Sequence, residues 1–116
     1  MDEITSLQAE VLKSLAHPRR LEIMRRLDDG PCEVGALAEE LQISQPNLSQ
    51  HLAVLRATGL VEAVRDGREV RYQLADPEVI TACSIMRRVL ERRIARLASL
   101  SVPTPGDTPT RSPARP

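Results

Sequence analysis

The spacing of apolar residues predicts an amphipathic helix at the beginning of the chain. Its apolar members recur every three or four positions, so that they share one face of a helix; they are Ile4, Leu7, Val11 and Leu15. Thr5 and Gln8 stand three residues apart, which is the spacing of a capping box at a helix start. We therefore expect the first helix to be capped at Thr5 and to carry an apolar stripe along one side.

Three further helices are predicted by their boundaries and by the apolar residues between them. One opens at His17-Pro18, because proline is favourable in the first turn, and stops at the Asp-Gly-Pro of residues 29–31. The next spans residues 34–41. After a short connection, Ser44 is a good N-cap for a helix that reaches about Ala57 and is broken at Gly59.

The apolar period then changes from about 3.6 to about 2, which is typical of strands. Two alternating runs, residues 61–65 and 70–74, are separated by Asp66-Gly67, a strong hairpin signal. Asp76-Pro77-Glu78 provides an N-cap, a first-turn proline and an acidic first turn for a last helix that reaches about Leu100. The expected order is α-α-α-α-β-β-α, a mainly α fold with a small β-hairpin.

The length of 116 residues suits one domain. We expect residues 1–100 to form it. From position 101 to position 116, five of the sixteen residues are proline and the apolar periodicity stops. This composition indicates a disordered Pro-rich tail.

Two short helices joined by a tight turn, residues 34–41 and 44–57, are typical of a helix-turn-helix. In the second helix Leu48, Leu52 and Leu55 fall within one narrow sector and should face the core. The opposite side carries short neutral side chains, and no carboxylate occurs from position 44 to position 59. Its polar members can bond base edges or phosphates; they are Asn47, Ser49 and Gln50. Taken alone, this face is explained equally well as an ordinary solvated surface.

The hairpin tip favours the DNA-binding interpretation. Arg65 and Arg68 place two guanidinium groups there, within reach of phosphates or a minor groove. The hairpin is then a wing, and the fold is a winged helix-turn-helix. His51 lies at the edge of the core sector, where we expect it to make a structural hydrogen bond rather than a base contact.

The net charge of zero conceals a polarity along the chain. Residues 1–43 hold nine acidic and five basic side chains, residues 44–75 three and four, and residues 76–100 three and five. Residues 44–75 contain the second helix of the helix-turn-helix and the hairpin, and we call them the reading head. Their basic excess is small, so one protomer should bind DNA weakly and useful affinity should need two.

The last helix carries a heptad-like apolar seam that one small domain cannot cover. Its members are Val79, Cys83, Met86, Leu90, Ile94 and Leu97. Leu7 and Val11 of the first helix are its natural partners. The sequence therefore predicts a homodimer that presents two recognition helices to major grooves roughly 34 Å apart on a double-stranded, pseudo-palindromic operator.

Composition excludes several other classes of protein. Tyr72 is the one aromatic residue, so a stacking platform for single-stranded nucleic acid is not expected. The longest apolar runs fall far short of the roughly 20 residues of a membrane helix, and no signal peptide is evident, so we expect a cytoplasmic protein without a membrane partner. No catalytic constellation is visible, which argues against an enzyme. The remaining rival is a winged-helix protein-interaction module that does not bind DNA.

Several segments together resemble the ArsR/SmtB family of winged helix-turn-helix repressors. The resemblance covers about residues 7–95, and its motifs are LAHPRRLEI at 15–23, LAE at 37–39, SQPNLSQHL at 44–52, LR at 55–56, GLV at 59–61 and DGR at 66–68. It implies a dimeric repressor that leaves its operator when an effector binds. By the family pattern, groove contacts fall to Gln45, Asn47, Ser49 and Gln50, and wing contacts to Arg65 and Arg68.

The effector sites of the family do not carry over to this chain. By the family resemblance, an arsenic-type site has Cys-Val-Cys at the positions where this chain has Glu33-Val34-Gly35. A zinc-type site has its second pair of ligands at the positions of Val89 and Arg92. No metal site is therefore predicted, and no cofactor is certain. Cys32 and Cys83 remain as candidate thiols for a thiol-reactive or soft-metal effector. For Cys83 a packing role in the seam is the stronger alternative, whereas Cys32 precedes a helix, whose start lowers a thiol pKa.

Overall fold

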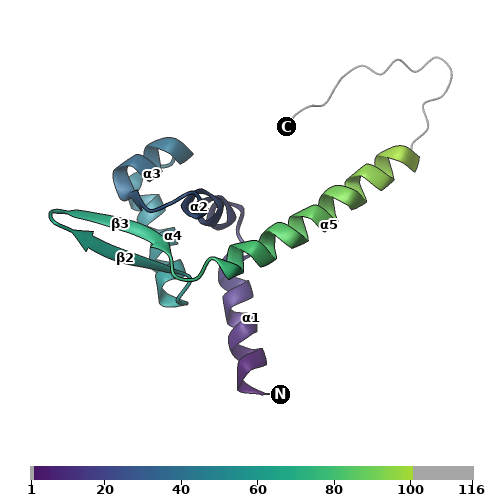
Figure 1. The fold of residues 1–116 in the computed structure, drawn as a ribbon, viewed down its shortest axis with the longest axis horizontal. Helices are drawn as coiled ribbons and strands as arrows, with labels where there is room; N and C mark the ends of the chain where they lie inside the picture. Colours follow the sequence, from purple (N-terminus) through teal and green to yellow (C-terminus); the bar gives the residue numbers. More distant parts are fainter. Residues whose placement is uncertain (1, 101–116) are drawn as a thin grey trace, which may run out of the picture. The chain divides into compact units, whose positions relative to one another are not determined.

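The computed structural model describes residues 2–100, and the predicted tail at 101–116 lies outside them. The described residues form five helices and three strands (Figure 1). In chain order these are α1 (Glu3–Leu15), α2 (Pro18–Asp28), β1 (Cys32–Glu33), α3 (Val34–Leu41), α4 (Gln45–Ala57), β2 (Val61–Asp66), β3 (Glu69–Leu74) and α5 (Glu78–Leu100). The expected four helices, hairpin and final helix are confirmed, and β1 is an addition.

The chain divides into two compact units between Ala82 and Cys83, inside helix α5. The first unit holds all of α1 to β3 and the first turn of α5, and the second holds the rest of α5. The single domain expected over residues 1–100 stays a prediction.

Asp2 caps helix α1, and the predicted Thr5 cap is wrong. The Asp2 carboxylate accepts a hydrogen bond from the backbone N–H of Thr5 at 2.8 Å, so Thr5 lies inside the first turn. A carboxylate satisfies an orphan donor and also faces the positive end of the helix dipole, which explains why it replaces the hydroxyl. Hydrogen bonding from the side chain of Thr5, and then from its backbone N–H, lowers the pKa of Asp2.

The core of the first unit is aliphatic and centres on helices α2, α3 and α4. Its largest fully buried side chains come from all three helices and from the first turn of α5; they are Ile23, Met24, Leu37, Leu48, Leu52, Leu55 and Ile80. The three leucines predicted to face inward from α4 are therefore all buried. Such packing needs no aromatic residue, which agrees with the composition.

A three-stranded antiparallel sheet in the order β1-β3-β2 closes one side of this unit. Strand β1 is only two residues long and pairs Cys32 with Tyr72. In the hairpin Asp66 pairs with Glu69, so the two-residue loop is Gly67-Arg68, one position later than the Asp-Gly signal suggests. Gly67 has φ +65°, the backbone conformation that the first position of a type II′ turn demands.

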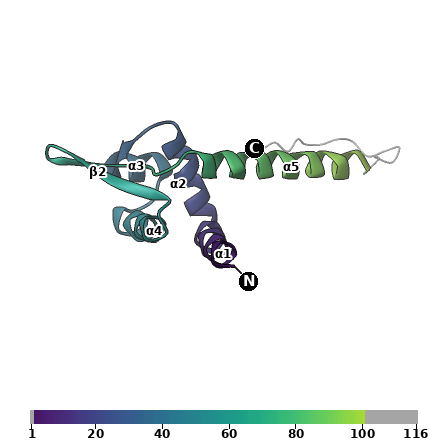
Figure 2. The same cartoon turned by 60° about the horizontal axis from the view of Figure 1, so that its bottom comes forward.

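Both views show the β2–β3 hairpin projecting beyond helices α2, α3 and α4, as the wing of a winged helix does (Figures 1 and 2). Helix α5 has many exposed apolar side chains along its length. No helix within residues 2–100 is long and apolar enough to cross a membrane.

Truncation of Leu52 tests the α4 packing. Leu52 is 1% exposed, and Leu52→Ala should lower the free energy of unfolding by about 2–5 kcal/mol, because it leaves a cavity in an aliphatic core. The measurement is chemical denaturation at a fixed protein concentration, with exposed Ala53→Ser as the matched control on the same helix. A loss below about 0.5 kcal/mol, the range of ordinary surface substitutions, would contradict this packing.

Candidate nucleic-acid interface

A tight three-residue turn joins α3 to α4 and fixes how the second helix leaves the first. Gln42 adopts the left-handed conformation with φ 56°, its N–H bonds the Glu39 carbonyl at 3.2 Å, and the N–H of Ile43 bonds the Ala38 carbonyl at 3.0 Å. These two bonds form a Schellman motif, which ends α3 and satisfies its last carbonyls. Ser44 then starts α4 by accepting from the N–H of Asn47 at 3.3 Å. The turn is thus the one a helix-turn-helix requires.

Helix α4 is divided lengthwise into a buried face and an exposed face. Leu48, Leu52 and Leu55 are buried at 0–1% exposure. The polar residues selected by the sequence are exposed, and they are Gln45, Asn47, Ser49 and Gln50. Since amides and hydroxyls without carboxylates cover this face, it can approach a phosphate-lined groove without charge repulsion.

Gln45 differs from the other three polar residues in its surroundings. Its amide nitrogen lies only 3.4 Å from the position a Cβ would take on Gly35, at the start of α3. The carboxylate oxygens of Glu33 approach the same position at 3.1 and 3.3 Å. Gly35 therefore leaves room for Gln45 beside α3, whereas Asn47, Ser49 and Gln50 lie further along the exposed face.

The wing holds two exposed arginines whose charges are not neutralised by ion pairs. Arg71 bonds Glu69 at 3.3 Å, but Arg65 and Arg68 form no salt bridge within residues 2–100. Arg68 occupies the hairpin loop. Arg65 lies on the same face of β2 as buried Val61, and Glu62 and Val64 lie on the other face. Both guanidinium groups are thus available to an anion at the tip.

The recognition helix is attached to its neighbours through His51, as expected of a structural histidine. His51 is 8% exposed, and its Nδ1 accepts a hydrogen bond from Arg20 Nε at 3.1 Å. Burial lowers the pKa of His51, and the nearby charges of His17, Arg20 and Arg19 lower it further. The imidazole is therefore neutral near pH 7 and acts as an acceptor. The sequence did not reveal Arg20 as its partner, since the two residues stand 31 positions apart.

Cys32 does not have the lowered pKa expected of a thiol at a helix start. It lies in strand β1 at 5% exposure, and burial raises its pKa. Glu33 instead takes the N-cap position of α3, where its carboxylate accepts from the N–H groups of Gly35 at 3.0 Å and Ala36 at 3.1 Å. The positive end of the helix is thus already compensated by Glu33, and Cys32 Sγ lies 3.9 Å from a second carboxylate, that of Glu40.

The second candidate thiol, Cys83, is half-buried and belongs to the second unit, whereas Cys32 belongs to the first. Asp76 accepts from the N–H of Glu78 at 3.0 Å and so starts α5. Among residues 2–100 no group of three or more His, Cys, Asp or Glu side chains is placed to hold a metal ion.

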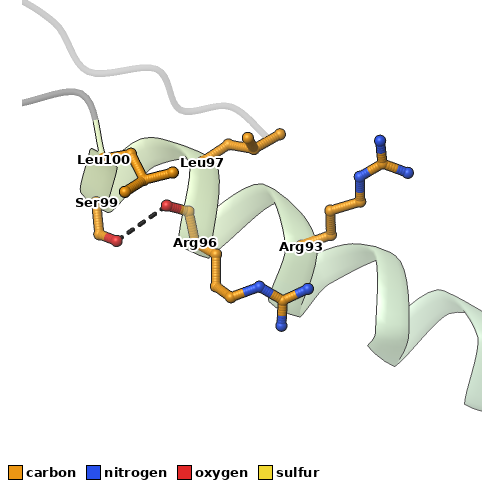
Figure 3. A pocket seen from close by; sticks show the side chains of 5 residues that line it. All are labelled: Arg93, Arg96, Leu97, Ser99 and Leu100. Carbon is orange, nitrogen blue, oxygen red and sulfur yellow. Dashed lines mark hydrogen bonds between the residues drawn. The ribbon is translucent and has the colours of Figure 1, made fainter.

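A shallow hollow lies at the C-terminal end of α5 (Figure 3). Its lining contains two arginines and two leucines, and a serine whose hydroxyl donates to the Arg96 carbonyl at 2.9 Å. These residues are Arg93, Arg96, Leu97, Ser99 and Leu100. They include none of the residues proposed to sense an effector.

Comparisons with known proteins agree with this geometry. Residues 17–63, which include the helix-turn-helix and the beginning of strand β2, match the family described as bacterial regulatory protein, arsR family. The uncharacterized HTH-type transcriptional regulator Rv0081 of Mycobacterium tuberculosis is 38% identical over 104 residues, which cover 85% of this chain and 91% of that protein. The chain belongs to the ArsR family. The HTH-type transcriptional regulator CmtR of Mycobacterium bovis is 41% identical over 85 residues, 73% of this chain and 72% of CmtR.

Solved structures of similar proteins share the fold. The crystal structure of Rv0081 superposes with a TM-score of 0.74 at 35% identity, over 84% of this chain and 99% of that one. The solution structure of the homodimeric winged helix-turn-helix DNA-binding domain of Mb0332 from Mycobacterium bovis has a TM-score of 0.74 at 30% identity, over 80% and 86% of the two chains. This ArsR-family chain is thus a winged helix-turn-helix transcriptional regulator, and its family is one of regulators rather than of enzymes.

The burial of Cys32 gives a measurable thiol reactivity. In a Cys83→Ser variant, where Cys32 is the one remaining thiol, the reaction with Ellman's reagent at neutral pH should be many times slower in the folded protein than in denaturant. Both the lost access and the raised pKa of Cys32 reduce the exposed thiolate. Equal rates in the two states would show that Cys32 is an open, reactive thiol after all.

Proposed function

We propose that this ArsR-family chain is a homodimeric repressor that binds a pseudo-palindromic duplex operator and is released from it by an effector. One observation carries the proposal: α4 is held by a helix-turn-helix with its leucines buried and a carboxylate-free, hydrogen-bonding face exposed. In such proteins the second helix enters the major groove. The cytoplasmic location and the class of effector, thiol-reactive or soft-metal, stay predictions.

The exposed residues divide by the kind of contact they suit. Asn47 and Gln50 have amides that pair with adenine edges, Ser49 has a hydroxyl for a base or phosphate, and Gln45 stands at the start of the helix near Gly35. Arg65 and Arg68 suit phosphates or a minor groove, because neither is engaged in an ion pair within the described residues.

Exposed apolar side chains support the dimer. Leu7 is 54% exposed on α1, and Met86, Leu90 and Ile94 are 54%, 47% and 66% exposed on α5. Val11, Val79 and Cys83 are half-buried on the same two stripes. Side chains of this size at heptad spacing are usually covered in the working assembly. The similar winged helix-turn-helix domain of Mb0332 is homodimeric, which supports a second copy of this chain as the cover.

A winged-helix module without DNA binding is the competing function. Gel-shift assays of the purified protein against the region upstream of its own gene, and against duplexes selected from a random pool, separate the two at two salt concentrations. Saturable, sequence-specific binding that weakens with salt supports the repressor. Absence of binding to any duplex at low salt would leave the interaction module.

Two substitutions on the reading head should have different signatures. Gln50→Ala should weaken operator binding by about 1–3 kcal/mol and reduce discrimination between bases, because an amide contact to a base edge is lost. Arg68→Ala should weaken binding to all sequences alike and lower the salt slope by about one, because a phosphate contact is lost. Fluorescence anisotropy titrations with operator and scrambled duplexes at several salt concentrations measure both.

Arg25→Ala is the matched control for Arg68→Ala, since Arg25 is an exposed arginine of α2 outside the proposed interface. It should leave affinity and salt slope close to those of the parent. If Gln50→Ala and Arg68→Ala cause equal, sequence-blind losses, the recognition face has been assigned wrongly.

A charge in the α5 seam should break the dimer. Leu90→Glu places a carboxylate among the exposed apolar residues of the stripe, so it should yield a monomer in sedimentation equilibrium and weaken operator binding sharply. Arg88→Glu introduces the same side chain on the opposite face of the same helix and should remain dimeric. A dimeric Leu90→Glu protein would show that the seam is not the interface.

A further inference from the structure

A polar bridge inside the first unit joins the last turn of α1 to the middle of α4. Arg20, near the start of α2, donates from Nη1 to the backbone carbonyl of Ser14 at 3.0 Å and from Nε to His51 Nδ1 at 3.1 Å. One guanidinium group therefore holds a backbone atom of α1 and a side chain of α4 at once. Because its donors form a rigid fork, this double contact fixes an angle as well as a distance.

A second polar contact joins the same turn of α1 to the end of α4. Ser14 Oγ donates to the Val11 carbonyl at 2.8 Å and lies 3.2 Å from Thr58 Oγ1. Thr58 is the C-cap of α4, and its hydroxyl contacts the Val54 carbonyl at 3.2 Å. Helix α4 is thus attached to the last turn of α1 at two points, at His51 and at Thr58.

His17 completes the junction on the side of α2. Its Nδ1 accepts from the N–H of Arg19 at 3.2 Å, which caps α2. The rings of His17 and His51 meet edge to face, with centroids 4.7 Å apart. Since Nδ1 of His51 accepts, the proton of its neutral imidazole lies on Nε2.

We propose that Arg20 is a positioning residue for DNA recognition, which sets the tilt of α4 against α1 through its bridge from the Ser14 carbonyl to His51. The proposal rests on the proposed function, in which α1 belongs to the dimer interface. Two recognition helices must meet one operator at a fixed separation, so the attachment of α4 to a dimer helix determines which half-site spacing fits. Arg20, Ser14 and His51 do not touch DNA in the proposal; the exposed face of α4 does.

Four variants distinguish loss of the bridge from loss of charge, loss of side-chain volume and loss of folding. Arg20→Lys keeps the charge but loses the fork, and His51→Leu fills the space but loses the acceptor. His51→Asn retains an acceptor near the place of Nδ1. Arg25→Ala removes an exposed arginine from the same helix as Arg20 and serves as the control.

The readouts are the affinity for the selected operator, the affinity for the same half-sites moved apart by one and two base pairs, and the melting temperature of the free protein. Arg20→Lys and His51→Leu should bind the operator about ten-fold more weakly, the size expected when one charge-assisted hydrogen bond is lost. They should also prefer the correct spacing less than the parent does. His51→Asn and Arg25→Ala should behave as the parent, and all four should melt within a few degrees of it.

The pH profile provides a readout that simple loss of stability does not reproduce. A protonated His51 cannot accept from Arg20, so the bridge exists in the neutral form and is lost as the pH falls. Because burial and the charges of His17, Arg20 and Arg19 hold the pKa of His51 below 6.5, operator affinity should be constant above that value and should decline beneath it. The decline should persist in His17→Asn, which retains a good N-cap, and vanish in His51→Asn.

The proposal is overturned if Arg20→Lys and His51→Leu keep the affinity and spacing preference of the parent, or if every loss of affinity is matched by a loss of folding. A parent protein that binds no duplex instead refutes the proposed function. The bridge is then decided by nitrogen NMR of the two histidines. His51 should carry its neutral proton on Nε2, and its pKa should rise in Arg20→Lys; an unchanged His51 would overturn the bridge.

Discussion

The burial of one leucine face of α4 is the constraint on which the reading head depends. Leu48, Leu52 and Leu55 have almost no contact with solvent, and this fixes the rotation of the helix about its axis. The same rotation leaves Asn47, Ser49 and Gln50 outside. The turn at Gln42 then fixes where the helix starts, and the hairpin places two arginines at the edge of the same unit. The exposed polar face of α4 is therefore a consequence of packing.

Carboxylates at helix starts explain how a chain of zero net charge can have a carboxylate-free exposed face on α4. Asp2, Glu33 and Asp76 each accept backbone N–H groups at the beginning of a helix, where a negative charge is stabilising. Arg26 and Glu40 are paired at 2.6 Å, and this pair lowers the pKa of Glu40. Part of the acidic charge is thus engaged in local structure, so the zero total says little about the surface offered to DNA.

The sequence predicts the parts of this structure that depend on neighbours along the chain. Ser44, Pro46 and Gly59 bound α4 closely, and the period of the leucines predicts which face is buried. Strand β1 could not be predicted in this way, because two residues have no period. It forms only because Cys32 pairs with Tyr72, 40 positions later in the chain. The direction predicted for the pKa of the Cys32 thiol is wrong. Proximity to a helix start predicts a lowered pKa, but Glu33 occupies the N-cap position and burial raises the pKa of Cys32 instead.

The junction of α1, α2 and α4 is where long-range polar contacts matter most. Elsewhere the core of the unit is packed mainly with leucine, isoleucine, valine and methionine. A buried hydrogen bond adds little net stability because it replaces bonds to water. It does add direction, which aliphatic contacts lack. The rigid guanidinium of Arg20 can donate to both the Ser14 carbonyl and His51 Nδ1 in only one arrangement of the two groups. Polar groups at this junction are therefore better explained by the need for a defined helix angle than by the need for a stable core.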